Sequence, residues 1–192
     1  MNLKEKTLTE ILRGFGKVAV ALSGGLDSGA LLHFAASALG TENCAALTAD
    51  TPQMPRAEMG DSERLCAAAG VARRAVKSAE IPEAIRENPP DRCYLCKHEL
   101  FEKIIAVAKE SNLQYVAEGS NMDDNGDYRP GLQAVAELQV KSPLRHVGLT
   151  KQEIRDYSHQ LGLPTWDKQS FACLSSRFVY GEEITEQKLG MV

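Results

Sequence analysis

The chain has 192 residues, of which 43% are hydrophobic and 25% are charged, and its formal net charge is −4. These values are typical of a globular chain with one good core. The acidic balance argues against a nucleic-acid partner, because binding phosphates along a backbone needs a basic face. No apolar run approaches the roughly 20 residues that span a bilayer, and the N-terminus lacks the apolar core of a signal peptide. We therefore expect a cytoplasmic protein without a membrane partner.

Apolar residues recur with alternating helical and strand-like spacing along the chain. Helices are expected at 7–15, 26–39, 55–69, 92–109 and 150–161, with a short helix or turn at 131–136. Strands are expected at 17–22, 44–49, 71–76, 115–118 and 139–144, and a polar loop at 123–130. Gly70 is a candidate C-cap, and Thr150 with Glu153 predicts a capping box. This order predicts an α/β fold, an open five-stranded parallel sheet with helices on both faces.

A Ser-Gly-Gly-Leu-Asp-Ser motif at 23–28 lies where the first strand gives way to a helix. Its glycines allow a tight loop, and the unpaired N–H groups and dipole of a helix start favour an anion. No Gly-Lys-[Ser/Thr] follows, so the loop is not of the Walker A type. The alternative is a helix cap without a ligand. We predict a phosphate-binding loop, with the following residues as its contacts: Ser23, Gly24, Gly25, Asp27 and Ser28.

Further polar residues follow the second and fourth predicted strands. Asp50 ends the second strand, and Gly119 and Asn121 follow the fourth. In an open parallel sheet, ligands bind beyond the carboxyl ends of the strands. These residues are therefore predicted to line the same nucleotide site as the loop. Asp50 and Asn121 are equally consistent with ordinary turn residues.

The five cysteines fall into two groups. Cys44 in a strand and Cys66 on a helix are predicted to be small buried hydrophobic residues. Cys93 and Cys96 open a predicted helix, whose N-terminus lowers a thiol pKa, and Cys173 lies in a polar loop. An odd number of cysteines in the cytoplasm favours thiols, metal ligands or catalysts over disulfides. These three thiols could hold a [4Fe–4S] cluster with one open iron; partial burial without a ligand is the alternative for the helical pair.

The motifs at 23–28, 88–97, 118–124 and 166–177 together resemble the LarE family of ATP-dependent sulfur transferases, in the PP-loop ATP pyrophosphatase superfamily. The resemblance covers about 15–181 and is most specific around Cys173. It implies a Rossmann-like fold of the adenine nucleotide alpha hydrolase type, with ATP and Mg²⁺ as cofactors. Some members use the cysteine matching Cys173 as a sacrificial sulfur donor. This chain has the pattern of the members whose three cysteines look suited to a [4Fe–4S] cluster.

The resemblance also implies a small-molecule substrate, pyridinium-3,5-biscarboxylate mononucleotide. Its carboxylates are adenylated with release of pyrophosphate and then converted to thiocarboxylates, on the way to the nickel-pincer cofactor of lactate racemase. We expect adenosine to lie near Asp50 and Gly119. Cys173 is the expected catalytic residue, and Arg177 is expected to favour its thiolate or to bind a phosphate.

Residues 1–180 are expected to form the PP-loop domain. Residues 181–192 are expected to begin a C-terminal region that is missing or truncated, because family members usually continue beyond this point. Two other functions stay open. The first is tRNA thiolation, which the acidic charge opposes, and the second is non-catalytic adenine-nucleotide binding, which the intact loop opposes. The sequence leaves the oligomeric state open, with a homo-oligomer as one alternative.

Overall fold

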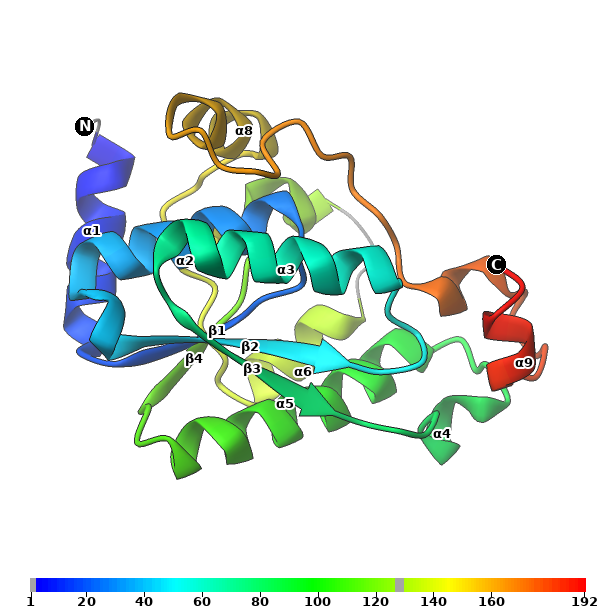
Figure 1. Ribbon diagram of the computed structural model, residues 1–192. Helices are drawn as coiled ribbons and strands as arrows, with labels where there is room; N and C mark the ends of the chain where they lie inside the picture. Colours follow the sequence, from blue (N-terminus) through cyan, green and yellow to red (C-terminus); the bar gives the residue numbers. More distant parts are fainter. Residues whose placement is uncertain (1–2, 127–129) are drawn as a thin grey trace.

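A parallel β-sheet forms the centre of the protein (Figure 1). The structure is a computed structural model that describes residues 3–126 and 130–192. In these ranges the sheet has four strands in the order β3-β2-β1-β4, and every pair is parallel. The strands are β1 (Val18–Ala21), β2 (Cys44–Asp50), β3 (Ala72–Lys77) and β4 (Tyr115–Ala117). The predicted α/β class with a parallel sheet is confirmed, and β1 is an interior strand.

The predicted fifth strand at 139–144 is wrong. Lys141 makes a single parallel bridge beside β4, in which its N–H donates to Val116 O at 2.8 Å. The extended run cannot continue on either side. Gln139 has a left-handed φ of 56°, and Pro143 has no N–H to donate and begins the short helix α7 (Pro143–His146). Residues 127–129 of the predicted polar loop lie outside the described residues.

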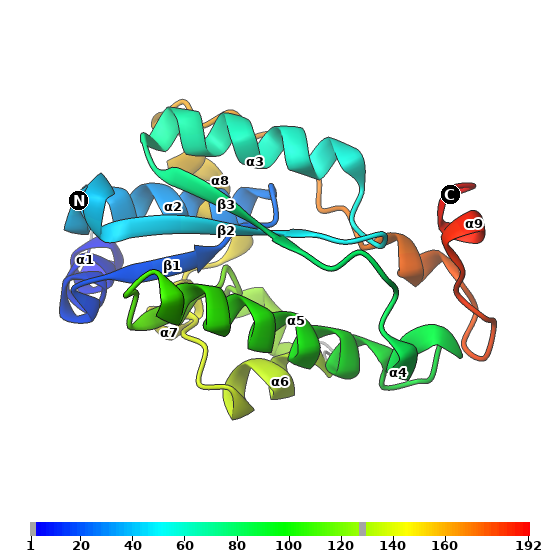
Figure 2. The ribbon, with the colours of Figure 1, turned by 60° about the horizontal axis from the view of Figure 1, so that its bottom comes forward.

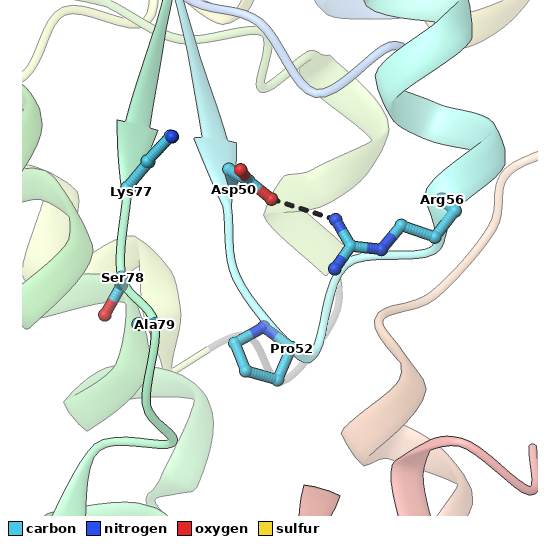
Figure 3. A pocket seen from close by; sticks show the side chains of 6 residues that line it. All are labelled: Asp50, Pro52, Arg56, Lys77, Ser78 and Ala79. Carbon is cyan, nitrogen blue, oxygen red and sulfur yellow. Dashed lines mark hydrogen bonds and ion pairs between the residues drawn. The ribbon is translucent and has the colours of Figure 1, made fainter.

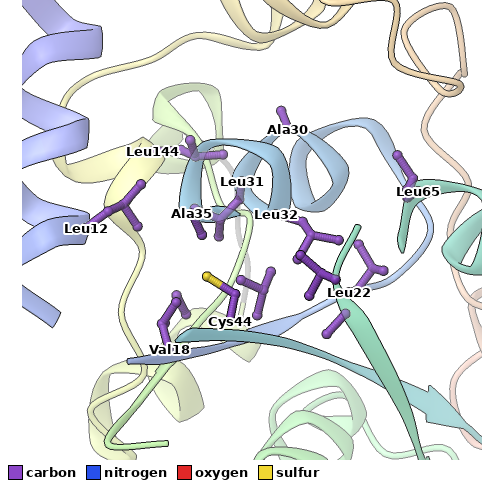
Figure 4. Packing of buried hydrophobic residues seen from close by; sticks show 14 of the residues in the cluster. Leu12, Val18, Leu22, Ala30, Leu31, Leu32, Ala35, Cys44, Leu65 and Leu144 are labelled. Carbon is purple, nitrogen blue, oxygen red and sulfur yellow. The ribbon is translucent and has the colours of Figure 1, made fainter. Parts of the chain in front are cut away.

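One face of the sheet is covered by four helices around the main hydrophobic core. These are α1 (Leu3–Phe15), α2 (Leu26–Leu39), α3 (Arg56–Ala69) and α8 (Lys151–Gln160). Figure 4 shows Leu31 and Ala35 of α2 lying over Val18 and Cys44 of the strands. Burying one leucine side chain contributes about 1.5–3 kcal/mol, so the many apolar residues of α2 anchor its first turn firmly to the sheet.

The other face is covered by α5 (Arg92–Glu110) and α6 (Gly131–Glu137), as Figure 2 shows. Phe101 and Ile104 of α5 and Val135 of α6 pack there against Val116. A third cluster lies beyond the ends of β2 and β3, where α4 (Glu83–Arg86) meets α9 (Glu186–Leu189). Short 3₁₀ turns complete the described elements: η1 (Thr41–Asn43), η2 (Met122–Gly126) and η3 (Leu174–Arg177).

Local signals in the sequence match the structure closely. Gly70 ends α3 in the left-handed conformation with a φ of 66°, and Thr150 and Glu153 form the predicted capping box of α8. Cys44 and Cys66 are buried, and burial raises the pKa of each thiol to about 11, so both stay neutral in the core. Over the described ranges, no helix is both long and apolar enough to cross a membrane.

Candidate active site

The phosphate-binding loop predicted at 23–28 joins the interior strand β1 to α2. Hydrogen bonds between the first and last residues of the loop hold its two ends together. The hydroxyls of Ser23 and Ser28 lie 3.0 Å apart, and the main-chain N–H of Ser23 donates to Ser28 Oγ at 3.2 Å. Gly25 is the N-cap of α2 and has no side-chain cap, so the first N–H groups of the helix stay available to a ligand.

Two glycines allow other segments to approach this loop closely. Gly24 has a φ of +81°, and a Cβ there would lie 2.4 Å from the carbonyl oxygen of Glu58 in α3. A Cβ on Gly119, after β4, would lie 2.7 Å from the main-chain nitrogen of Ser28. Real side chains almost never come so close to backbone atoms. The structure therefore brings the predicted residue Gly119 directly against the start of α2.

Two lysines from distant parts of the chain reach the loop. Lys168 Nζ donates to Gly24 O at 3.1 Å and pairs with Glu58 at 2.8 Å and with Asp61. Lys151, the first residue of α8, pairs with Asp27. The sequence reading missed both lysines, because neither lies near the loop in sequence. Lys168 does lie within the motif at 166–177, and that was the only signal available for it.

Asp27 is suited to a magnesium ion. Its Oδ2 pairs with Lys151, whereas its buried Oδ1 has no hydrogen-bond partner among the residues that the structure describes. Mg²⁺ prefers oxygen ligands and is usually held by one or two carboxylates together with substrate phosphates. An unpartnered carboxylate oxygen at the start of a helix therefore fits a magnesium ion that arrives with a nucleotide.

Asp50 lines a pocket of about 200 Å³ at the ends of β2 and β3 (Figure 3). Its carboxylate accepts a hydrogen bond from Arg56 at 3.0 Å, and Lys77 lies on the opposite wall. Asn121 has the contacts of a turn residue: its Oδ1 accepts from the N–H of Asp123 at 2.9 Å. The structure thus places Asp50 in a pocket and uses the side chain of Asn121 for a local turn.

The three predicted site cysteines lie close enough to influence one another. Cys93 and Cys96 are in the first turns of α5, and Cys173 immediately precedes η3. The pKa of the Cys96 thiol is raised to about 11, mainly by burial and also by the neighbouring Cys173 and Cys93. Burial also raises the pKa of Cys173, although this residue is solvent-exposed. For Cys96, the expected lowering of the pKa at the helix start is therefore wrong, because burial outweighs it.

Thiols are the right donors for a [4Fe–4S] cluster, but their arrangement does not fit one. In the part of the chain that the structure describes, no group of three or more His, Cys, Asp or Glu side chains could hold a metal ion. The cluster is therefore not supported, and no chemical step below depends on it. The cation that lowers the pKa of Cys173 is Arg92; Arg177 lies instead over the ring of Phe171 at 5.0 Å.

A continuous stretch, residues 168–173, joins the loop to these thiols. It begins at Lys168 on the carbonyl of Gly24 and ends at Cys173, whose neighbour Leu174 donates its N–H to Gln53 O at 3.0 Å. None of its residues is helical or in a strand. The structure thus connects the 23–28 loop to a group of thiols through six residues without regular secondary structure.

An interior parallel strand that runs into a Ser-Gly-Gly-x-Asp-Ser loop at a helix start defines a nucleotide-using α/β protein of the PP-loop superfamily. Comparison with known proteins agrees. The model of the NAD synthase family matches residues 3–113. The chain therefore belongs to this family. One of its relatives, described next, is an enzyme of the kind that the LarE resemblance indicates.

Two relatives match almost the whole chain. A pyridinium-3,5-bisthiocarboxylic acid mononucleotide synthase from Lactiplantibacillus plantarum is 30% identical over 98% of this chain and 69% of its own length. An uncharacterized protein from Synechocystis is 40% identical over 100% of this chain and 72% of its own length. Among solved structures, an NH3-dependent NAD synthetase from Campylobacter jejuni superposes with a TM-score of 0.63 at 18% identity. That match covers 88% of this chain and 78% of the other, and it supports the fold.

Proposed function

We propose that the protein is an ATP-dependent sulfur transferase that adenylates a substrate carboxylate, releases pyrophosphate and replaces AMP with sulfur. The observation that supports this most directly is the stretch 168–173, which links the phosphate loop to Cys173. The 30% identity to a pyridinium-3,5-bisthiocarboxylic acid mononucleotide synthase indicates the substrate class, a pyridinium mononucleotide that carries carboxylates.

The loop would bind the β and γ phosphates of ATP. The main-chain N–H groups at the start of α2 and the positive end of its dipole face the anion. Glu58 and Asp61 hold Lys168 at the loop, so this cation would lie close to the charge that develops on the leaving pyrophosphate. Asp27 Oδ1 would hold the Mg²⁺, which neutralises phosphate charge when it is bound.

In the first step an oxygen of the substrate carboxylate attacks the α-phosphorus of ATP. The bond from this phosphorus to the bridging oxygen breaks, and pyrophosphate leaves with the electron pair. The product is an acyl-adenylate, whose carbonyl carbon is a good electrophile because AMP is a good leaving group. Adenosine would lie toward the ends of β2 and β4, near Asp50 and Gly119, which flank the loop on either side of β1.

In the second step the sulfur of Cys173, as its thiolate, attacks that carbon, and AMP leaves with the electrons of the broken carbon–oxygen bond. A thioester between the substrate and Cys173 results. Loss of the Cα proton of Cys173 and cleavage of its Cβ–S bond then release a thiocarboxylate and leave dehydroalanine. The arrangement of the thiols does not support a cluster as the sulfur source, and an iron and sulfide assay on anaerobically purified protein would test that conclusion.

The experiment supplies ATP, Mg²⁺ and the dicarboxylate mononucleotide, and it measures pyrophosphate, AMP and thiocarboxylate. We expect equal amounts of pyrophosphate and AMP, and a Cys173 that has lost hydrogen sulfide by mass spectrometry. The variant Cys173→Ala should still release pyrophosphate but form no thiocarboxylate, whereas Asp27→Asn should lose both. Release of ADP, or thiocarboxylate formation by Cys173→Ala, would contradict the proposal.

A further inference from the structure

Arg92, the first residue of α5, is buried, with 5% of its surface exposed. A buried guanidinium carries a charge and five N–H donors, so it must find acceptors within the protein. Its NH1 donates to Oδ1 of Asn88 at 2.6 Å and to the main-chain oxygen of Ser175 at 2.7 Å. The ring of Tyr180 lies 5.7 Å from the guanidinium carbon. Arg92 therefore contacts η3 at Ser175 and the chain that follows it at Tyr180.

Asn88 completes the attachment of the same segment. It is fully buried and has a left-handed φ of 49°, and its Nδ2 donates to Val179 O at 2.6 Å. Its main-chain oxygen accepts from the N–H of Gly181 at 3.0 Å, and Arg86 O accepts from Ile184 at 2.8 Å. Residues 173–184, which we call the Cys173 segment, are thus bound to the α4–α5 junction through polar contacts, of which those of Arg92 are buried.

The same guanidinium faces the thiols. Its NH2 lies 3.8 Å from Cys93 Sγ, and its charge acts on Cys96 and Cys173 as well. Cys173 stands two residues before Ser175, whose carbonyl Arg92 binds. Arg177, which lies within the Cys173 segment itself, is exposed and lies over Phe171. Arg92 is therefore the cation with both a fixed position and a direct contact to the backbone beside Cys173.

We propose that Arg92 is the positioning residue for Cys173: with Asn88 it ties the Cys173 segment to α5 and so holds this thiol beside Cys93 and Cys96. Without these side-chain contacts, the segment would keep its apolar contacts with α4 and α9 and the main-chain hydrogen bonds of Leu174, Gly181 and Ile184. Cys173 would then leave the edge of the sheet where the acyl-adenylate forms. This inference rests on the proposed function for the sulfur step alone; the tie itself can be tested without any activity.

The first test is hydrogen exchange on the full chain. The variant Arg92→Met removes the tie, and Arg86→Met is the matched control, because the Arg86 side chain is exposed and pairs with the exposed Glu83 of its own helix. Amides of the Cys173 segment, such as Gly181 and Ile184, should exchange about tenfold to a hundredfold faster in Arg92→Met, as expected when a hydrogen bond to a charged group is lost. They should change less than about twofold in the control.

Amides of β1 and β2 report whether the fold survives. If Arg92→Met unfolds the whole chain, Asn88→Gly decides, because glycine accepts the left-handed backbone at 88 and only the side-chain contacts are lost. Faster exchange confined to the Cys173 segment in either variant supports the proposal. Unchanged exchange in that segment, with the sheet intact, overturns it.

The second test uses Arg92→Lys, which keeps the charge but is shorter and lacks the planar guanidinium whose two nitrogens reach Asn88 and Ser175 on one side and Cys93 on the other. The ratio of thiocarboxylate to pyrophosphate should fall at least about tenfold in Arg92→Met and should not recover in Arg92→Lys. Full recovery in Arg92→Lys would show that charge alone matters and would overturn positioning. If the wild-type chain forms no thiocarboxylate, the proposed function fails, while the exchange experiment still decides whether the tie exists.

Discussion

Substituting Gly119 tests how closely β4 and the phosphate loop must pack. A Cβ at Gly119 would lie 2.7 Å from Ser28 N and 3.0 Å from the main-chain carbon of Asp27, against an ordinary contact of 3.4 Å or more. These are backbone atoms at the start of α2, which the core holds in place, so they cannot rotate away as a side chain could. The φ of Gly119 lies outside the left-handed range, so the contact alone sets the cost.

Gly119→Ala should therefore push the loop by several tenths of an ångström and lower the free energy of unfolding by about 1–3 kcal/mol. Displacement of a reacting group by about 1 Å can cost about a hundredfold in rate, so pyrophosphate release should fall about tenfold or more. Gly60→Ala is the control: no atom lies within 4 Å of its Cβ, and it is inside α3. At position 60, alanine should raise the free energy of unfolding by about 0.5–1 kcal/mol and leave the rate of pyrophosphate release unchanged.

Both variants are compared by urea unfolding and by pyrophosphate release at saturating ATP. The reasoning would be refuted if Gly119→Ala matched the wild type within twofold in rate and within about 0.5 kcal/mol in stability. An equal loss in Gly60→Ala would also refute it, since that would show a general effect of replacing glycine.

Three further predictions concern stability, and each is measured by urea unfolding. Lys168→Met should cost about 3 kcal/mol, because it removes the ion pair of the nearly buried Glu58 carboxylate and leaves Asp61 with Arg64 alone, whereas Lys103→Met at an exposed pair should cost less than about 1 kcal/mol; equal losses would contradict this. Thr150→Ala should cost about 1 kcal/mol by removing the capping box, and Thr150→Ser should restore most of it; no loss in the alanine variant would contradict the cap. Folding raises the thiol pKa of Cys44 and Cys66 from 9.0 to about 11. Their contribution to the free energy of unfolding is therefore fully present below about pH 9 and is lost as the pH rises to about 11. Replacing both Cys44 and Cys66 by alanine should make the free energy of unfolding fall less steeply between about pH 9 and about pH 11, and an unchanged slope would contradict the prediction.

Local patterns predicted the elements well because their signals are local. The apolar spacing placed α2 at 26–39, and the Ser-Gly-Gly-x-Asp-Ser motif placed the loop on an interior strand. The error at 139–144 has a local cause as well. Its apolar residues suggested a strand, but Pro143 and the left-handed Gln139 limit the pairing to one bridge.

The charges of the site could not be predicted in the same way, because they come from distant segments. Lys168 lies 144 residues from Gly24 in sequence, and nothing local shows that its ammonium reaches the loop. Arg177 looked like the partner of Cys173 because it is near in sequence. The 3₁₀ turn η3 directs it to Phe171, while Arg92 reaches Ser175 from another element. Proximity in sequence was misleading where the tertiary fold decides.

The length of the stretch 168–173 limits the distance between the phosphate loop, where adenylation would occur, and Cys173, which would transfer the sulfur. The five Cα–Cα steps from Lys168 to Cys173 span at most about 18 Å when the chain is fully extended. Lys168 is fixed at the loop and the chain beyond Cys173 is fixed by Gln53 and Arg92, so both ends of the stretch are tied to the rigid part of the fold. A lysine that shifts toward incoming phosphates would pull on the backbone that carries Cys173. Such a shift of Lys168 would be transmitted to the thiol through a few residues without secondary structure.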